Sequence, residues 1–121
     1  MTSYRYTFPK SLRLGGRGTF KAIRDRGSRA SSGSLTLWAA PNEAGYTRLG
    51  ISIGRPVGTA PRRNRIKRLL RESFRLGQHD FPGGYDLVIA VRPHEPLGLE
   101  EYRKLLSQLI RKALAGRSGV V

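Results

Sequence analysis

The stretch GRPVGTAPRRNRIKRLLRESFR, residues 54–75, contains eight basic side chains and a single acid, Glu72. Its large apolar residues have the spacing that is typical of the buried face of an α-helix. They are Ile66, Leu69, Leu70 and Phe74. On such a helix the opposite, solvated face is expected to carry Asn64, Arg68, Arg71 and Arg75. Because like charges repel, a cluster of this density favours a polyanionic partner, RNA above all.

The start of this helix is predicted near Thr59, a good N-cap, with Pro61 in the first turn, where the N–H that proline lacks would have no helical partner. Ala60 is the weaker candidate for the cap. Three arginines then lie where the helix dipole is positive, at a cost of roughly 0.3–1 kcal/mol each. They are Arg62, Arg63 and Arg65. Free backbone N–H groups and guanidinium groups together favour phosphate binding, and Gly54 and Gly58 would allow close approach to the backbone.

A second helix, predicted over residues 98–115, has the opposite charge pattern. Glu100 and Glu101 lie in its first turn, and Arg111 and Lys112 lie near its end, as the helix dipole favours. Its apolar residues form one continuous stripe. They are Tyr102, Leu105, Leu106, Leu109, Ile110 and Ala113. We interpret this helix as structural.

A short helix is also predicted over residues 18–26. Phe20 and Ile23 are expected to face inward, and Gly27 is the candidate for a left-handed C-terminal cap. The next residues, 28–33, are expected to form a mobile loop.

Alternating apolar residues predict half-buried strands over residues 35–39 and 48–53, with a turn at residues 42–45. Residues 85–91 do not alternate, which predicts a central strand buried on both faces. The fold class is therefore α+β, a single-domain α/β sandwich with the order α-β-β-α-β-α and room for one extra short strand. A helix that connects two strands usually makes them parallel neighbours.

Composition limits the class of protein. The chain has 121 residues and a net charge of +15, which fits one basic domain. We expect an N-terminal arm over residues 1–16, a domain over residues 17–116 and a tail over residues 117–121. The chain lacks cysteine, a stretch long enough to span a bilayer and the apolar core of a secretory signal, so we expect a cytoplasmic protein without a membrane partner.

Few residues suggest catalysis by the protein itself. The eight acids are scattered, and His79 and His94 are each better explained as surface histidines. Ser52 and Ser73 have no base that the sequence reveals, and residues 58–65 lack the features of a nucleotide-binding loop. We therefore predict neither catalytic residues nor protein metal ligands. Trp38 has two interpretations, a platform for base stacking or packing beneath a helix.

Residues 48–72, RLGISIGRPVGTAPRRNRIKRLLRE, resemble the signature of the bacterial ribonuclease P protein family. In that family a strand of the form Gly-hydrophobic-Ser-hydrophobic leads through a basic, glycine-containing loop into Arg-Asn-Arg and then Lys-Arg-x-x-Arg. Here these segments are residues 50–53, 63–65 and 67–71. The resemblance continues, more weakly, over residues 12–114.

The resemblance implies an accessory protein that binds a large catalytic RNA and the 5′ leader of precursor tRNA. The RNA would cleave the precursor with Mg²⁺ held mainly by RNA and substrate, and no small-molecule substrate is implied. The residues expected to bind the catalytic RNA, from the resemblance and the basic cluster together, are Arg55, Gly58, Arg62, Arg63, Asn64, Arg65, Lys67, Arg68, Arg71 and Arg75. The residues expected to bind the leader are Phe20, Trp38, Arg48 and Ser52.

The sequence departs from the family pattern in three places. Arg24 replaces a second aromatic residue of the first helix, Pro56 replaces the second member of a basic pair, and Gly54 replaces a serine. The family also implies a left-handed strand-helix-strand crossover, against the general preference for right-handed ones.

Two other functions were weighed. A structural ribosomal or RNA-packaging protein would share the size and charge but not the Arg63-Asn64-Arg65 context. A nuclease that acts without RNA would need clustered acids or a pair of histidines, which the sequence does not suggest.

Overall fold

A computed structural model describes residues 17–78, 80–81 and 83–118 of the chain. The N-terminal arm expected over residues 1–16 lies outside this part, as do residues 119–121 of the tail. The helices are α1 (Arg17–Arg26), the short 3-10 helix η2 (Arg55–Val57), α2 (Ala60–Gly77) and α3 (Leu99–Ser118), and the strands are β1 (Ser28–Ser31), β2 (Leu35–Pro41), β3 (Arg48–Ile53) and β4 (Tyr85–Val91). This order confirms the α+β class, with β1 as the extra short strand.

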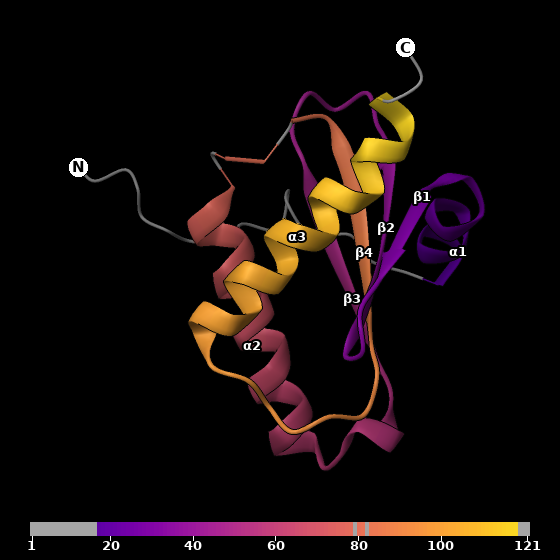
Figure 1. Cartoon of the computed structure of the whole chain (residues 1–121). Helices are drawn as coiled ribbons and strands as arrows, with labels where there is room; N and C mark the ends of the chain where they lie inside the picture. Colours follow the sequence, from indigo (N-terminus) through magenta and orange to yellow (C-terminus); the bar gives the residue numbers. More distant parts are fainter. Residues whose placement is uncertain (1–16, 79, 82, 119–121) are drawn as a thin grey trace.

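The strands form one sheet in the order β1-β2-β4-β3, with β4 parallel to β3 and antiparallel to β2. The turn after β2 therefore joins two strands that are not neighbours, because β4 lies between them. β4 is the central strand predicted from its unbroken apolar run, and four of its seven residues in succession, 86–89, are buried. Seen from the side of α2 and α3, with β3 and β4 pointing up, β4 lies to the left of β3, so the crossover is left-handed (Figure 1).

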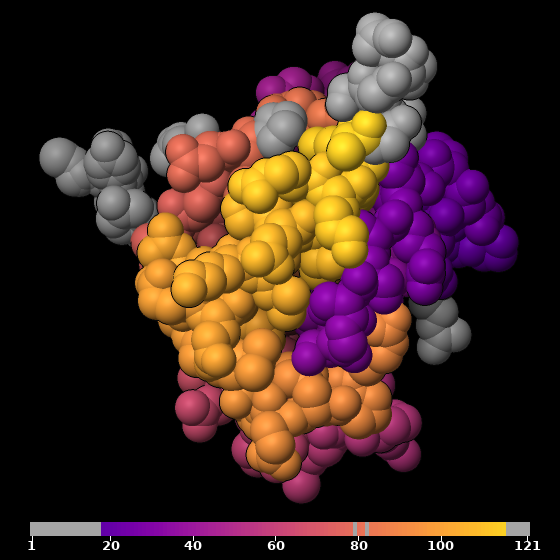
Figure 2. Space-filling model, in the orientation of Figure 1, coloured from indigo at the N-terminus to yellow at the C-terminus, as the bar shows by residue number. Residues whose placement is uncertain are grey.

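The sheet separates two apolar clusters. On one face α2 and α3 pack against the sheet and bury Leu70, Phe74, Tyr102 and Leu106, each at most 1% exposed. On the other face α1 packs through Ile23 onto a smaller cluster. In the space-filling view, α3 crosses the middle of the first face, between the end of α2 and the segment formed by α1 and β1 (Figure 2). Both interpretations of the apolar stripes, in α2 and in α3, are confirmed.

Two local predictions near α1 were wrong. Residues 28–31 form β1, which pairs with β2 and is not a loop. Gly27 is not among the glycines with positive φ in the described residues, and its N–H continues the helix by donating to the Ile23 carbonyl. Gly27 is needed for space, since a Cβ there would lie 2.7 Å from the Ile23 oxygen and 3.0 Å from the Ala39 oxygen. The glycine lets the end of α1 lie directly against β2.

No helix in the described part of the chain combines the length and the hydropathy that a membrane crossing requires.

Candidate nucleic-acid interface

The basic helix starts as its sequence predicts. Thr59 is the N-cap of α2, its side-chain oxygen accepts from the Arg62 N–H at 3.4 Å, and Pro61 lies in the first turn. The first turn contains no acid. Gly58, just before the cap, has φ +149°, a conformation that favours glycine. The Arg62 side chain folds over it, so that a Cβ on Gly58 would lie 2.4 Å from the Arg62 Cδ. Gly58 therefore accommodates an arginine, and that arginine occupies the space where we expected a phosphate to approach.

The arginines at this end point in different directions around the helix. Arg63 donates from Nε to the Gly58 carbonyl at 3.2 Å, toward η2. Arg62 faces the loop before α3, where its guanidinium lies 3.6 Å from Glu95. The Glu95 side chain is 88% exposed, so this pair leaves the local charge strongly positive. Asn64 and Arg65 are exposed between these two sides.

Farther along α2 the basic residues differ in exposure. Arg68 is exposed, and Lys67 and Arg71 are half-buried. Arg75 was expected on the solvated face, and this prediction was wrong. Its side chain is only 11% exposed and is bonded to Glu72. We define the basic helix surface by the residues that remain accessible. They are Arg55, Arg62, Arg63, Asn64, Arg65, Lys67, Arg68 and Arg71.

A second candidate surface lies on the sheet beside α1. The cross-strand register places Gly50, Val88 and Trp38 in one row and Ser52, Ala90 and Thr36 in the next. Small side chains dominate the end of this face near β3, whereas Trp38 and Phe20 pack against the cluster beneath α1. We call this region the α1-side face, defined by Phe20, Trp38, Gly50, Ser52 and Ala90. Its end at Ser52 adjoins η2, because only Ile53 and Gly54 separate them in the chain.

Trp38 packs beneath α1, which is one of its two interpretations. It is half-buried against the α1 cluster, and the Arg24 guanidinium carbon lies 5.9 Å from the centre of its ring. A cation over an indole face is a favourable contact. Arg24, which replaces a family aromatic, therefore still contributes a flat group to this face. Sequence reasoning noted Arg24 only as a departure and did not predict this contact.

Arg48 is held at the far end of the same face. Its Nε and Nη2 donate to the two oxygens of Asp86 at 2.8 and 2.9 Å, and Asn42 donates to the same carboxylate at 2.7 Å. The hydrogen bond to Asp86 raises the pKa of Arg48 above its ordinary value, against the effect of burial. The Asp86 side chain is only 5% exposed, whereas that of Arg48 is 32% exposed. Arg48 therefore compensates the buried carboxylate of Asp86, and its partly exposed guanidinium lies at one end of the α1-side face.

Arg92, which sequence reasoning missed, closes the other end of the sheet. Its guanidinium donates to the hydroxyls of Ser31 and Thr36 at 2.7 and 2.6 Å and to the Ser32 carbonyl at 2.8 Å. These bonds tie the hairpin of β1 and β2 to the end of β4. No short-range sequence signal predicts this contact, because the partners lie about sixty residues away in the chain.

The remaining candidate for acid–base chemistry, His94, is engaged in the structure. One ring nitrogen lies 2.7 Å from the Arg92 carbonyl and the other lies 2.7 Å from the Tyr102 hydroxyl. The same hydroxyl accepts from the Leu97 N–H at 3.2 Å. Burial raises the pKa of Tyr102, while the Leu97 bond and the charge of Arg65 lower it. His94 and Tyr102 thus fix the loop before α3 next to the basic helix surface, and His79 lies outside the described residues.

Comparisons with known proteins agree on one family. A family model described as Ribonuclease P matches residues 8–114. A ribonuclease P protein component from Photobacterium profundum is 41% identical over 106 residues, 87% of this chain and 90% of that protein. The ribonuclease P protein from Thermotoga maritima is 33% identical, with a TM-score of 0.73 over 82% of this chain and 96% of that one.

The ribonuclease P protein from Staphylococcus aureus, at 24% identity, shares the fold, with a TM-score of 0.76 over 86% of this chain and 96% of that one. These matches do not favour the alternative of a structural ribosomal-type protein. The chain belongs to the ribonuclease P protein family, the protein components of a tRNA-processing endoribonuclease that also contains RNA.

Proposed function

We propose that the basic helix surface binds the catalytic RNA of ribonuclease P. The observation that carries this proposal is the start of α2, where five accessible residues of the segment from Arg62 to Lys67 are arginine, asparagine or lysine and no acid lies in the first turn. Guanidinium groups suit phosphate oxygens, and the positive end of the helix dipole adds to their attraction for an anion. Arg75 is left out because its side chain is committed to Glu72.

The α1-side face is the proposed binding surface for the 5′ leader of precursor tRNA. Phe20 and Trp38 offer ring surface on which unpaired bases can stack. The small side chains of Ser52 and Ala90 leave the sheet accessible beside them, and the partly exposed guanidinium of Arg48 lies at one end. Since this face adjoins η2, a leader bound there would lie next to the catalytic RNA bound by α2.

The Mg²⁺ that the family implies is assigned to the RNA components. Within residues 17–78, 80–81 and 83–118, no three side chains of histidine, cysteine, aspartate or glutamate come together in a way that suits a metal ion. The buried carboxylate of Asp86 is already bonded to Arg48 and Asn42. The protein would contribute by binding RNA and by reducing the repulsion between the phosphates of catalytic RNA and substrate.

Cleavage of precursor tRNA at low Mg²⁺ concentration tests the proposal. Three reactions are compared: the matching catalytic RNA with this protein, the catalytic RNA alone, and the protein alone. We expect cleavage at the mature 5′ end only when both components are present. Cleavage by the protein alone would overturn the assignment of the chemistry to RNA, and the absence of stimulation would overturn the accessory role.

The leader assignment is tested separately with Trp38→Leu and the matched control Trp38→Phe, which keeps an aromatic ring. We expect Trp38→Leu to weaken binding of leader-containing precursor by roughly tenfold while binding of mature tRNA changes little, because stacking is worth about 1–3 kcal/mol per base. Trp38→Phe should retain most of the preference. Equal precursor binding by both variants would show that Trp38 only packs against α1.

A further inference from the structure

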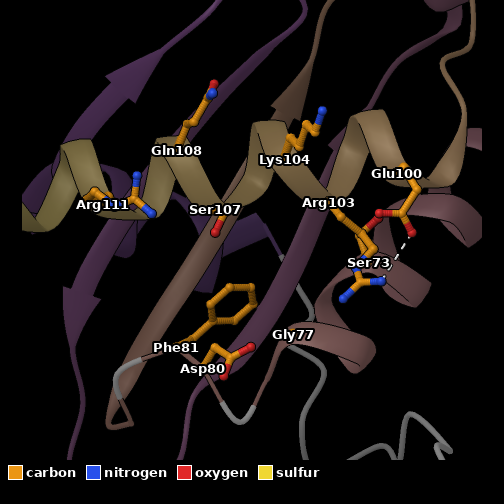
Figure 3. Close-up of a pocket in the computed structure, with 10 residues that line it drawn as sticks. All are labelled: Ser73, Gly77, Asp80, Phe81, Glu100, Arg103, Lys104, Ser107, Gln108 and Arg111. Carbon is orange, nitrogen blue, oxygen red and sulfur yellow. Dashed lines mark hydrogen bonds and ion pairs between the residues drawn. The ribbon is translucent and has the colours of Figure 1, made fainter.

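A groove of about 370 Å³ lies between the C-terminal half of α2 and α3, on the side of the sheet opposite the α1-side face (Figure 3). A second cavity of about 370 Å³ continues along α3 toward Leu114 and Ala115. The two cavities share four lining residues, Asp80, Phe81, Ser107 and Arg111. Each has the volume of a small ligand site, and neither belongs to the surfaces described above.

Phe81 forms the aromatic part of this groove. Its ring packs at 5.9 Å from the ring of Phe74, which is buried in the main core. Gly77 makes this position available, since a Cβ at Gly77 would lie 2.8 Å from the Phe81 ring. The ring is only half-buried, and it points from its loop toward the side of α3 that carries Ser107 (Figure 3). Phe81 is therefore held in place while part of the ring still faces the groove.

The rim of the groove is cationic and polar. Lys104, Gln108 and Arg111 are exposed residues of α3 that line it. Glu100 also lines the groove, and Arg103 donates to its carboxylate at 3.1 Å, so these two charges offset each other. Asp80 adds a carboxylate beside Phe81. The groove thus combines an aromatic ring, two cationic side chains and hydrogen-bonding groups within one cavity.

We propose that this groove binds an unpaired nucleotide of the catalytic RNA. The base would stack against Phe81, its phosphate would lie against Lys104 and Arg111, and an exocyclic amino group would donate to Asp80. Unpaired bases stack on aromatic side chains, and Lys and Arg bind the adjoining phosphates. Asp80 favours a base that carries an amino group over one that does not.

The position of the groove on α2 identifies this RNA as the partner. Ser73 in the groove lies eight positions after Arg65 of the basic helix surface, which corresponds to about 12 Å along the helix axis. A strand that binds the start of α2 can therefore reach the groove within a few nucleotides. The leader, by contrast, is assigned to the opposite face of the sheet. The inference rests on the proposed binding of the catalytic RNA by α2.

The test compares Phe81→Leu and Arg111→Ala with two matched controls. Phe81→Tyr keeps the ring, and Lys112→Ala removes one exposed charge from the residue next to Arg111 that does not line the groove. Affinity for the catalytic RNA is measured over a range of salt concentrations, and the unpaired bases of that RNA are probed chemically with each protein bound. Thermal unfolding establishes that each variant is folded at the assay temperature.

We expect Phe81→Leu to weaken binding by on the order of tenfold without changing the salt dependence, and to expose one or two bases that the unsubstituted protein and Phe81→Tyr protect. Arg111→Ala should lower the salt slope by about one, and Lys112→Ala should change neither quantity. Normal affinity and unchanged base protection with Phe81→Leu would overturn the groove assignment. So would a loss confined to precursor tRNA. If the unsubstituted protein does not bind the catalytic RNA, the proposed function is overturned together with the groove. If Arg65→Ala weakens RNA binding but the groove substitutions do not, only the groove assignment is overturned.

Discussion

α2 and α3 lie side by side on the same face of the sheet but have opposite charge at their starts. α3 begins with Glu100 and Glu101, and Glu101 accepts from the Gly98 N–H at 2.9 Å, so its first turn is stabilised by charge and by a cap. α2 begins with Arg62 and Arg63 and contains no acid in its first turn. Since both helices bury an apolar stripe against the same sheet, the difference in charge is not required for packing. It agrees with the proposal that the start of α2 binds RNA, whereas the charges at the start of α3 stabilise that helix.

The largest effect is expected from the core residue Leu106 of α3. Its side chain is fully buried, so Leu106→Ala should lower the free energy of unfolding by about 3 kcal/mol, through lost burial and the cavity that remains. Urea denaturation measures this loss. Leu70→Ala, at an equally buried position of α2, is the matched control and should cost a similar amount. Because Leu106 is buried and lines neither cavity beside α3, the folded Leu106→Ala protein should bind the catalytic RNA with an affinity within about twofold of the original.

A single charge near the start of α2 should matter more for RNA binding than a charge on α3 that lies outside the groove at Phe81. Arg65 and Lys112 are both exposed, so Arg65→Ala and Lys112→Ala each remove one accessible cation. We expect Arg65→Ala to weaken binding of the catalytic RNA by about tenfold and to lower the salt slope by about one, because it removes a phosphate contact. Lys112→Ala should change affinity by less than about twofold. Equal losses in a titration at fixed salt would remove the distinction between the two helices.

The stability of the protein should fall at alkaline pH because of Tyr102, which joins α3 to the loop that precedes it. Burial raises the pKa of Tyr102, so the folded protein retains a proton that the unfolded chain loses above its ordinary pKa of about 10. This contribution to stability is complete below pH 10 and is lost as the pH rises through the raised pKa. Tyr102→Phe should lower stability by about 1 kcal/mol near neutral pH, because His94 and the Leu97 N–H lose a partner.

Denaturation curves between pH 8 and pH 11 (roughly the range of tyrosine titration) check this expectation. The stability of Tyr102→Phe should fall less steeply with alkali than that of the original protein. A parallel fall in both would show that other groups cause the alkaline loss.

The smallest effects should have opposite sign at the two helix starts. Arg62→Gln removes a cation from the first turn of α2 while a long side chain still covers Gly58, and it should raise stability by about 0.5 kcal/mol. The partner Glu95 is 88% exposed, so losing that ion pair should cost little. Glu101→Gln in α3 should instead lower stability by about 0.5 kcal/mol. Precise thermal unfolding compares the pair, and RNA binding should weaken only for Arg62→Gln.

The elements that were predicted correctly are those with strong local sequence signals. Thr59 and Pro61 located the start of α2, and the unbroken apolar run of residues 85–91 identified the central strand. An extra short strand was allowed for, but its position was predicted as a loop, because Ser28–Ser31 has no apolar alternation and forms β1 only by pairing with β2. Gly27 was assigned a left-handed conformation, whereas its real constraint is the approach of β2. Both errors concern positions where a distant segment decides the local structure.

The candidate surfaces also contain some features that local sequence predicted and others that only the structure revealed. The basic residues near the start of α2 are close in sequence, so helical spacing alone brought most of them together. The exclusion of Arg75 depended on its burial, which spacing did not reveal. The neighbourhood of Arg24 and Trp38 and the aromatic groove at Phe81 arise from contacts between separate elements.

The sequence by itself determined the class of fold and indicated an RNA partner, and it located the basic helix that we propose binds this RNA. Hydrophobic periodicity, capping and charge density are visible in it because they act over a few residues. Only the tertiary structure decided which cations remain accessible, which strands are neighbours and where aromatic rings face solvent. Those properties depend on burial and on pairing between segments such as Arg48 and Asp86, which lie 38 residues apart. Desolvation and packing act between such segments only once the chain has folded.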